Sequence, residues 1–271
     1  MPYDLILDSP ETFNEKNQWL KLHDRNPLYT ELVDKIAVKG YIASAVGDQY
    51  NVPLLGVYDD PSEIDFDSLP DQFVLKCNHN SHYGISICRD RSRFDQRKAV
   101  ASLRRALKQN YYYVGREWPY KNVKPRVLAE KLLVDESNPL GGITDYKFYC
   151  FSGVATFVLV CAERFTGHTK FYFFDRHWDL MRFKKENLEL PNDFTFPKPR
   201  NMDAMFGLAS ALSRNIPFVR IDLYSVGGKI YFSEFTFYPH SGFDSSLLKE
   251  ADELLGKMVN LSSAFGRFSP K

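Results

Sequence analysis

The sequence lacks the features that mark several large classes of protein. Its 271 residues contain four cysteines and no CxxC pair, which excludes the usual zinc-binding spacings and a disulfide-rich secreted fold. No apolar run approaches the roughly eighteen residues of a membrane-spanning helix, and the first residues show neither the basic region nor the apolar core of a signal peptide. We therefore expect a cytoplasmic protein without a transmembrane segment, in which the cysteines are small, buried and reduced.

Charge excess and the common nucleotide motifs are also missing. The net charge is +1, so the chain as a whole has no electrostatic attraction for nucleic acid or an anionic membrane, and basic groups that matter must act locally. The sequence contains no GxxxxGK[ST], GxGxxG or GxSxG motif, and its six histidines have no metal-ligand spacing. Any nucleotide site is therefore of neither the P-loop nor the Rossmann type.

The chain is rich in aromatic residues, with 22 Phe and 16 Tyr, as is typical of sheets packed under helices. Periodicity predicts helices over residues 11–23, 95–110, 202–214 and 247–262, and strand alternation dominates from residue 145 onward. The basic residues of the 95–110 helix are interpreted as a solvated face, because the neutral net charge argues against a nucleic-acid surface. Lys35 and Lys39, four residues apart, are interpreted in the same way.

The segment 219–242, VRIDLYSVGGKIYFSEFTFYPHSG, is the part around which the chain is organised, and it predicts two strands joined at a Gly-Gly turn. Because side chains alternate along a strand, a two-residue turn would point Glu234 away from Asp222. A three-residue loop instead places Arg220, Asp222, Glu234 and Thr236 on one face and separates polar from apolar residues, so we favour it. That register brings two carboxylates within reach of one Mg2+; the alternative is an amphipathic hairpin with a surface Arg–Asp pair.

Several charged residues stand at strand ends or inside apolar runs, where they are costly unless they are paired or used; these are Lys76, Glu130, Asp145, Lys147, Arg220, Asp222 and Glu234. Lysines and an arginine together with two acids are what the binding of a magnesium nucleotide requires. Lys76 ends a strand before the polar loop 78–84, so the tip of this hairpin could close over phosphates. The alternative is a surface hairpin whose lysine reaches solvent.

The order of five blocks resembles the TupA-like ATP-grasp family, named for teichuronopeptide biosynthesis, over roughly residues 30 to 256. The blocks are FVLKCNHNSHYGISI, REWPYKNVKPRVLAEKLL, DYKFYCFSG, PKP at 197–199 and FVRIDLYSVGGKIYFSEFTFYPHSG. The resemblance implies an α+β, ATP-grasp fold in which two lobes with antiparallel sheets sandwich the nucleotide. It also implies an N-terminal helical and connecting region (1–60), a first lobe with the phosphate-lid hairpin (61–135) and a second lobe with the metal-site hairpin (136–271).

The resemblance also assigns roles to residues of this chain. It implies that Arg220 and Lys147 are catalytic, and that Asp222, Glu234 and Thr236 bind metal. The nucleotide contacts that it implies are Lys76, Asn78, Ser81, Glu130, Lys131, Leu132, Leu133, Glu136 and Asp145, with Asp135 as the alternative to Glu136 at the ribose. The sequence departs from the family at the lid tip (residues 80–82) and at Ser233, where relatives have glycine, and at Thr236, where many ATP-grasp enzymes have asparagine.

The function that the resemblance implies is ATP- and Mg2+-dependent ligation of a sugar or polymer carboxylate to an amine through an acyl phosphate, in cell-surface polysaccharide synthesis. The expected partners are the two substrates and possible polysaccharide-assembly enzymes, with no nucleic acid. Two alternatives remain: a small-molecule kinase of the same fold, and a degenerate nucleotide-binding protein without activity. A glycosyltransferase is less favoured, because no DxD-type motif occurs in a nucleotide-sugar context.

Overall fold

A computed structural model describes residues 5–81, 83–135, 142–163 and 167–262. The chain divides into two compact units: unit 1 comprises Met1–Asn26 and Asp135–Lys271, and unit 2 comprises Pro27–Val134. This division differs from the expected one, because the first 26 residues belong to the C-terminal unit and residues 27–60 belong to the unit of the lid hairpin. Within the described ranges, no helix combines the length and apolar character needed to cross a bilayer.

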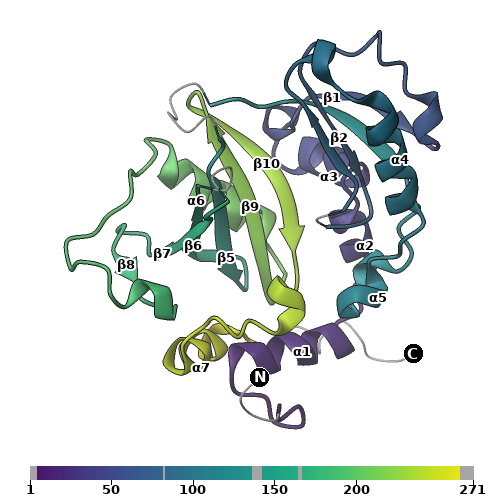
Figure 1. Cartoon of the computed structure of the whole chain (residues 1–271). Coiled ribbons are helices and arrows are strands. Elements are labelled where there is room, and N and C mark those ends of the chain that lie inside the picture. The colour runs from purple at the N-terminus through teal and green to yellow at the C-terminus, as the bar shows by residue number, and fades with distance from the viewer. Residues whose placement is uncertain (1–4, 82, 136–141, 164–166, 263–271) are drawn as a thin grey trace. The chain divides into compact units, whose positions relative to one another are not determined.

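Unit 2 is built on a four-stranded antiparallel sheet with the strand order β1-β4-β2-β3 (Figure 1). Its strands are β1 (Leu54–Tyr58), β2 (Phe73–Cys77), β3 (Ile85–Cys88) and β4 (Val127–Lys131). Its helices are α2 (Leu28–Val33), α3 (Ala37–Ala45), α4 (Gln96–Leu107) and α5 (Tyr112–Gly115), with 3-10 turns at Asp48–Tyr50, Pro61–Glu63, Arg91–Arg93 and Trp118–Tyr120. The hairpin predicted around the polar loop 78–84 is formed by β2 and β3.

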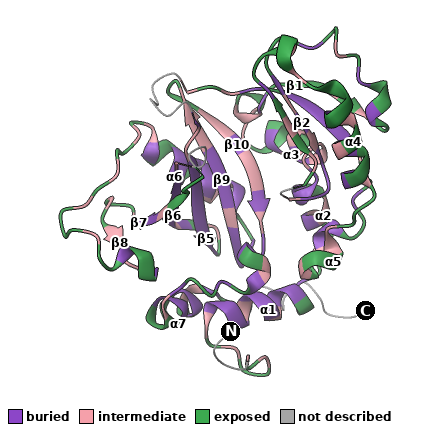
Figure 2. Ribbon diagram, viewed as in Figure 1, coloured by how far each residue is buried: buried purple, intermediate pink, exposed green. Residues whose placement is uncertain are grey.

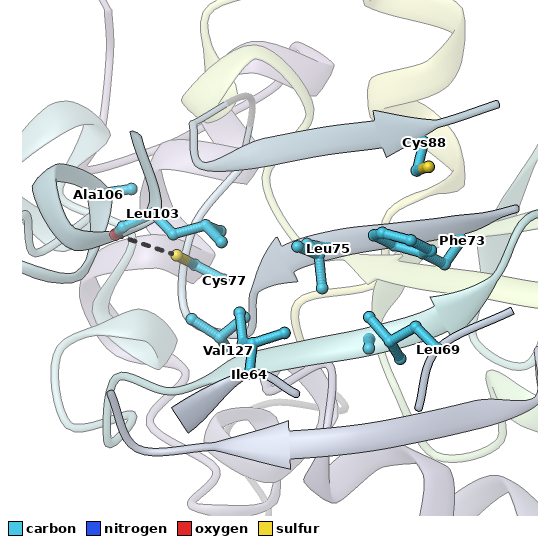
Figure 3. Close-up of a cluster of buried hydrophobic side chains, with 10 residues drawn as sticks. Ile64, Leu69, Phe73, Leu75, Cys77, Cys88, Leu103, Ala106 and Val127 are labelled. Atoms are coloured by element: carbon cyan, nitrogen blue, oxygen red, sulfur yellow. Dashed lines mark hydrogen bonds between the residues drawn. The ribbon is translucent and has the colours of Figure 1, made fainter. Parts of the chain in front are cut away.

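One face of this sheet is covered by α4. The helix begins after Asp95, whose side chain accepts a hydrogen bond from a backbone N–H of the first turn at 2.9 Å. Leu103 of α4 packs with Phe73 and Leu75 of β2 in the buried cluster shown in Figure 3. Because side chains alternate along a strand, Lys76 points to the opposite face of the sheet.

Unit 1 is built on a six-stranded antiparallel sheet with the order β10-β9-β5-β6-β7-β8. Its strands are β5 (Asp145–Phe151), β6 (Val154–Ala162), β7 (Lys170–Phe174), β8 (Leu180–Met181), β9 (Phe218–Val226) and β10 (Lys229–Thr236). Its helices are α1 (Phe13–His23), α6 (Met202–Leu212) and α7 (Lys249–Met258), with 3-10 turns at Lys185–Asn187 and Pro239–Gly242. The β-rich region predicted from residue 145 onward is therefore confirmed.

The two faces of the six-stranded sheet differ in what covers them. Phe148 of β5 packs edge-on against Phe206 of α6, with ring centroids 4.9 Å apart. The next residue, Tyr149, points to the other face, where its ring lies 6.1 Å from that of Phe13 in α1. Figure 2 shows that β5 is buried along its whole length. The charged residues of β5 lie on the Tyr149 face, and burial there makes pairing with neighbouring strands necessary.

The four cysteines are buried, free thiols, as the sequence predicts. Burial raises the pKa of the Cys77 thiol to about 11 and that of the Cys150 thiol to about 12. These thiols therefore stay protonated and act as small apolar side chains.

Candidate functional site

The hairpin of β9 and β10 brings together the polar residues that the sequence placed on one face. Asp222 pairs in register with Glu234, and Arg220 pairs with Thr236. The alternate residues of both strands form the apolar face and are buried; they are Val219, Ile221, Leu223, Phe235 and Phe237. The predicted sorting of polar and apolar residues is therefore confirmed.

The predicted cause of that sorting is wrong. Val226 pairs with Lys229, so the turn contains two residues, Gly227 and Gly228, and both have the positive φ (56° and 76°) that suits glycine in a tight hairpin. The extra residue lies within β10, where the register shifts between Phe232 and Glu234. Such a bulge sets two residues against one and reverses which face the following side chains occupy.

Five charged side chains from β5, β9 and β10 form a cluster, which we call the unit 1 cluster: Asp145, Lys147, Arg220, Asp222 and Glu234. Asp222 lies at its centre and is 1% exposed. Arg220 donates from Nε to Asp222 Oδ1 at 2.7 Å and from Nη2 to Oδ2 at 2.8 Å, and Lys147 Nζ donates to Oδ2 at 2.5 Å. Asp145 lies 3.6 Å from Lys147 Nζ, and Glu234 lies 3.9 Å from Arg220 Nη2.

The pairing keeps the centre of this cluster ionised. Burial alone raises the pKa of the Asp222 carboxyl, but the charges of Arg220 and Lys147 outweigh it and hold that pKa below its usual range. Burial lowers the pKa of Arg220, and the stronger attraction of Asp222 raises it above its ordinary value. The interpretation of Arg220 and Asp222 as a surface pair is therefore wrong, because Asp222 is buried and the side chain of Arg220, its partner, is only 11% exposed.

The donor set of this face fits Mg2+ bound jointly with phosphate oxygens. Asp222 already accepts three of the roughly four hydrogen bonds that a carboxylate can take. Glu234 is more available, since its side chain is 29% exposed and its ion pair is long. Thr236 Oγ1 accepts from Arg220 Nη2 at 3.0 Å and retains its own proton for a further bond. Among the described residues, no three His, Cys, Asp or Glu side chains could cage a metal, but Mg2+ needs only one or two carboxylates when phosphates supply other ligands.

Unit 2 contains a second charged group built around a buried carboxylate, which we call the unit 2 cluster: Lys39, Lys76 and Glu130. Lys39 Nζ lies 2.6 Å from Glu130 Oε1, and Lys76 Nζ lies 2.5 Å from Oε2. Glu130 is 4% exposed. Burial alone raises the pKa of the Glu130 carboxyl, but Lys76 and Lys39 together lower it, so the carboxylate remains ionised between two ammonium groups. The cluster therefore carries a net positive charge.

Lys39 is the residue that sequence reasoning missed. Its interpretation as part of a solvated face is wrong, because its ammonium group is bound to Glu130 and also donates to Val52 O at 2.8 Å. Burial lowers the pKa of Lys39, and the attraction of Glu130 only partly offsets this. Lys35 is also engaged, since its Nζ donates to Asn80 O at 2.5 Å. The signal that could have found Lys39 is the isolated acid Glu130 in an apolar strand, which needs cations from elsewhere in the chain.

The predicted nucleotide contacts of the β2–β3 tip are not equally available. Asn78 is fully buried and its side chain is used inside unit 2: Oδ1 accepts from Arg126 N at 2.7 Å, and Nδ2 donates to Asp34 Oδ1 at 2.9 Å. The side chain of Asn78 therefore shapes the base of the hairpin and is not offered to a ligand. Ser81 is half-buried at the tip.

The remaining predicted contacts lie at the end of β4 and in unit 1. Lys131 is exposed, Leu132 is buried and Leu133 is half-buried, whereas Glu136 falls outside the described residues. Asp145, predicted as a nucleotide contact, belongs to the unit 1 cluster beside Lys147. A shallow hollow near Arg89 and Lys131 does not include Glu130, because Lys131 and Glu130 point to opposite faces of the sheet.

Comparison with protein families gives a match that covers most of the chain. The sequence model of the family described as TupA-like ATP-grasp matches residues 15–260. No curated protein matches the chain.

Solved structures that resemble the chain include D-alanine–D-alanine ligase from Bacillus anthracis complexed with ATP, with 15% identity, a TM-score of 0.48 and coverage of 95% of this chain and 75% of that one. The D-alanine–D-alanine ligase from Helicobacter pylori has 14% identity, a TM-score of 0.46 and coverage of 92% and 69%. The biotin carboxylase domain of 2-oxoglutarate carboxylase from Hydrogenobacter thermophilus, in complex with MgADP, has 13% identity, a TM-score of 0.47 and coverage of 91% and 51%.

The family match rests on nearly the whole sequence, and the two helix-covered antiparallel sheets are the α+β architecture predicted for it. The chain therefore belongs to the TupA-like ATP-grasp family.

Proposed function

We propose that the chain is an ATP- and Mg2+-dependent ligase that joins a carboxylate to an amine through an acyl phosphate. We place it at the cytoplasmic stage of cell-surface polysaccharide synthesis, acting on a sugar or polymer carboxylate. The observation that carries the proposal is the unit 1 cluster, in which Lys147 and Arg220 hold the buried Asp222 ionised and Glu234 lies partly exposed beside Arg220. Membership of an ATP-grasp family supports the choice of ATP.

The unit 2 cluster supports a role in phosphate binding. Two ammonium groups share one carboxylate, so a positive charge remains for an anionic ligand. Lys76 is the more exposed of the two, with 21% of its side chain accessible against 14% for Lys39. We therefore propose Lys76 as a phosphate contact and Lys39 as a second cation close to it. Because each carboxylate oxygen of Glu130 is paired with a lysine, we propose that the backbone of Lys131–Leu133, and not the Glu130 side chain, binds the amino edge of adenine. We propose that Ser81 at the lid tip lies near the phosphates.

The proposed reaction has two steps. A substrate carboxylate oxygen attacks the γ-phosphorus, and the bond from that phosphorus to ADP breaks as the new P–O bond forms. The amine nitrogen then attacks the acyl carbon, phosphate leaves, and the ammonium proton is lost to solvent. Bound Mg2+ would supply charge neutralisation at the β- and γ-phosphates.

The residues of unit 1 act mainly by positioning. Arg220 and Lys147 fix Asp222, and Arg220 also binds the Thr236 hydroxyl at 3.0 Å, so the ligand atoms of Asp222, Glu234 and Thr236 are held before substrate arrives. Lys147 is 11% exposed in its side chain and is the proposed cationic contact to phosphate from this unit, with Asp145 behind it. Arg220 is proposed to steady the acyl phosphate through the same cluster.

The proposal is tested by measuring ADP and free phosphate against paired panels of uronic acids and amines. Glu234→Gln should abolish Mg2+-dependent turnover, while Glu253→Gln on α7, another partly exposed glutamate, should retain it. Full activity in Glu234→Gln would refute the metal assignment. ADP accompanied by a phosphorylated product, without free phosphate, would instead identify a kinase. Nucleotide binding without ADP release on any acceptor would identify a degenerate member of the family.

A further inference from the structure

The segment that contains helix α4 is strongly basic, although the net charge of the whole chain is close to zero. Residues 89–108 hold eight Lys or Arg and two Asp, so they carry a net charge of +6 although the whole chain carries +1. The helix itself contains no acidic residue. Besides Arg104, which is considered below, four exposed basic side chains belong to it: Arg97, Lys98, Arg105 and Lys108, which follows the last helical residue. We call these four residues the α4 basic face.

The α4 basic face points away from the core of unit 2. At 100° per residue, Arg97 and Lys108 lie within about 20° of each other around the helix, and the buried Leu103 lies on the opposite side. Leu103 and Ala106 pack in the buried cluster against the sheet (Figure 3), and Figure 2 colours part of the α4 ribbon as exposed residues. The helix therefore has no free apolar face with which to enter a membrane.

Partners within unit 2 engage basic side chains on the flank of α4 next to the segment that precedes β2. Arg104 pairs with Asp60 at 3.2 Å, and Arg91 donates to the backbone carbonyls of Phe66, Asp67 and Leu69. In the part of the chain that the structure describes, no carboxylate lies within ion-pair distance of the four residues of the α4 basic face. Their charges extend along about 16 Å of helix. Successive charges are at most about 10 Å apart along the axis, which is roughly one Debye length, so neighbouring charges can act together on an extended anionic ligand.

We propose that the α4 basic face is a docking surface for a polymer that carries carboxylates in series, such as a polyuronate. The inference rests on the proposed function, which requires a carboxylate substrate, and it specifies that substrate as polymeric. Regularly repeated carboxylates complement a row of cations, whereas a single carboxylate engages one of them weakly. Lys76 points from the other face of the same sheet, so the docking surface is separate from the phosphate-binding cluster and raises the local concentration of acceptor chain.

The test compares two variants of the full chain with equal loss of charge. Arg97→Gln, Arg105→Gln and Lys108→Gln are combined in one protein, and Lys185→Gln, Lys229→Gln and Lys257→Gln, all exposed in unit 1, are combined in the control. Binding of polygalacturonate is measured by calorimetry without ATP at several salt concentrations. The α4 variant should bind the polymer at least tenfold more weakly and with a smaller salt dependence, while the control should match the parent protein. Arg97→Lys with Arg105→Lys, which keeps the charge, should retain binding.

The other outcomes are equally decisive. Equal weakening in both triple variants, or in neither, would overturn the docking surface. Tighter binding of single-stranded DNA, or of vesicles containing phosphatidylserine, than of polygalacturonate at equal charge would assign the surface to another partner and also overturn it. ADP release with monomeric galacturonic acid and an amine should be the same in the α4 variant and the parent. If the α4 variant alone loses polymer binding but no protein, including the parent, releases ADP, the ligase proposal is refuted and the docking surface is supported.

Discussion

The unit 2 cluster makes a quantitative prediction, because one buried carboxylate is shared by two lysines. Glu130→Gln removes the anion and leaves two ammonium groups facing each other, which should cost about 3–5 kcal/mol of stability, the usual penalty for an unpaired buried charge. Lys39→Gln leaves Glu130 paired with Lys76 and should cost roughly 1.5–3 kcal/mol, as for the loss of a charged hydrogen bond. The double variant retains only Lys76, whose side chain is 21% exposed and can turn to solvent.

The double variant should therefore be far less damaged than the sum of the two single changes, with a coupling of about 1–3 kcal/mol. Hydrogen exchange resolved to the β2 and β4 peptides measures the opening free energy of the sheet that holds the cluster, and it does so without requiring unit 1 to unfold. The reasoning is refuted if the two changes add to within about 0.5 kcal/mol, or if Lys39→Gln leaves the exchange of β4 unchanged.

Three further predictions concern other parts of the molecule. Asp222→Asn should destabilise unit 1 by about 3–5 kcal/mol in urea unfolding, whereas Glu234→Gln, whose side chain is 29% exposed, should change stability by less than about 1 kcal/mol while abolishing turnover; equal stability losses would contradict the described burial. The pKa values of Asp222 and Glu130 are both lowered in the folded state, so the unfolded chain takes up these protons first as the pH falls. Stability should be fully present above the ordinary carboxyl range, decline from about pH 4 downward, and show a flatter profile in Asp222→Asn if unfolding is followed from pH 3 to 7. Gly256→Ala should lower the melting temperature although alanine favours helix, because its Cβ would lie 2.2 Å from a backbone carbonyl oxygen just before α1. Gly207→Ala in α6 has open space around it and should raise the melting temperature slightly. The opposite ranking of the two variants would contradict the packing of α7 on α1.

Local pattern in the sequence was sufficient to predict which side chains of the β9–β10 hairpin share a face. Polar and apolar residues alternate there, and a buried sheet face accepts only one sorting of them. The Gly-Gly pair marked the turn, and the order of motif blocks indicated the family. The sequence could not show whether a longer turn or a bulge at Ser233 produced the register, because both give the same face for Glu234.

The sequence by itself therefore determined the acidic hairpin, through the alternation of nearby residues, and the fold class, through the resemblance of its motif blocks to a family. Only the tertiary structure decided which groups meet. Lys39 reaches Glu130 from a helix 91 positions earlier in the chain, and Phe13 joins the N-terminal helix to the sheet of unit 1. The side-chain amide of Asn78 is hydrogen-bonded to Asp34 and to the backbone of Arg126, and sequence spacing does not reveal these partners. The alternation of residues along a strand or helix determines which of its faces is buried. The partners of a side chain from distant parts of the sequence depend on how these elements pack in the folded chain.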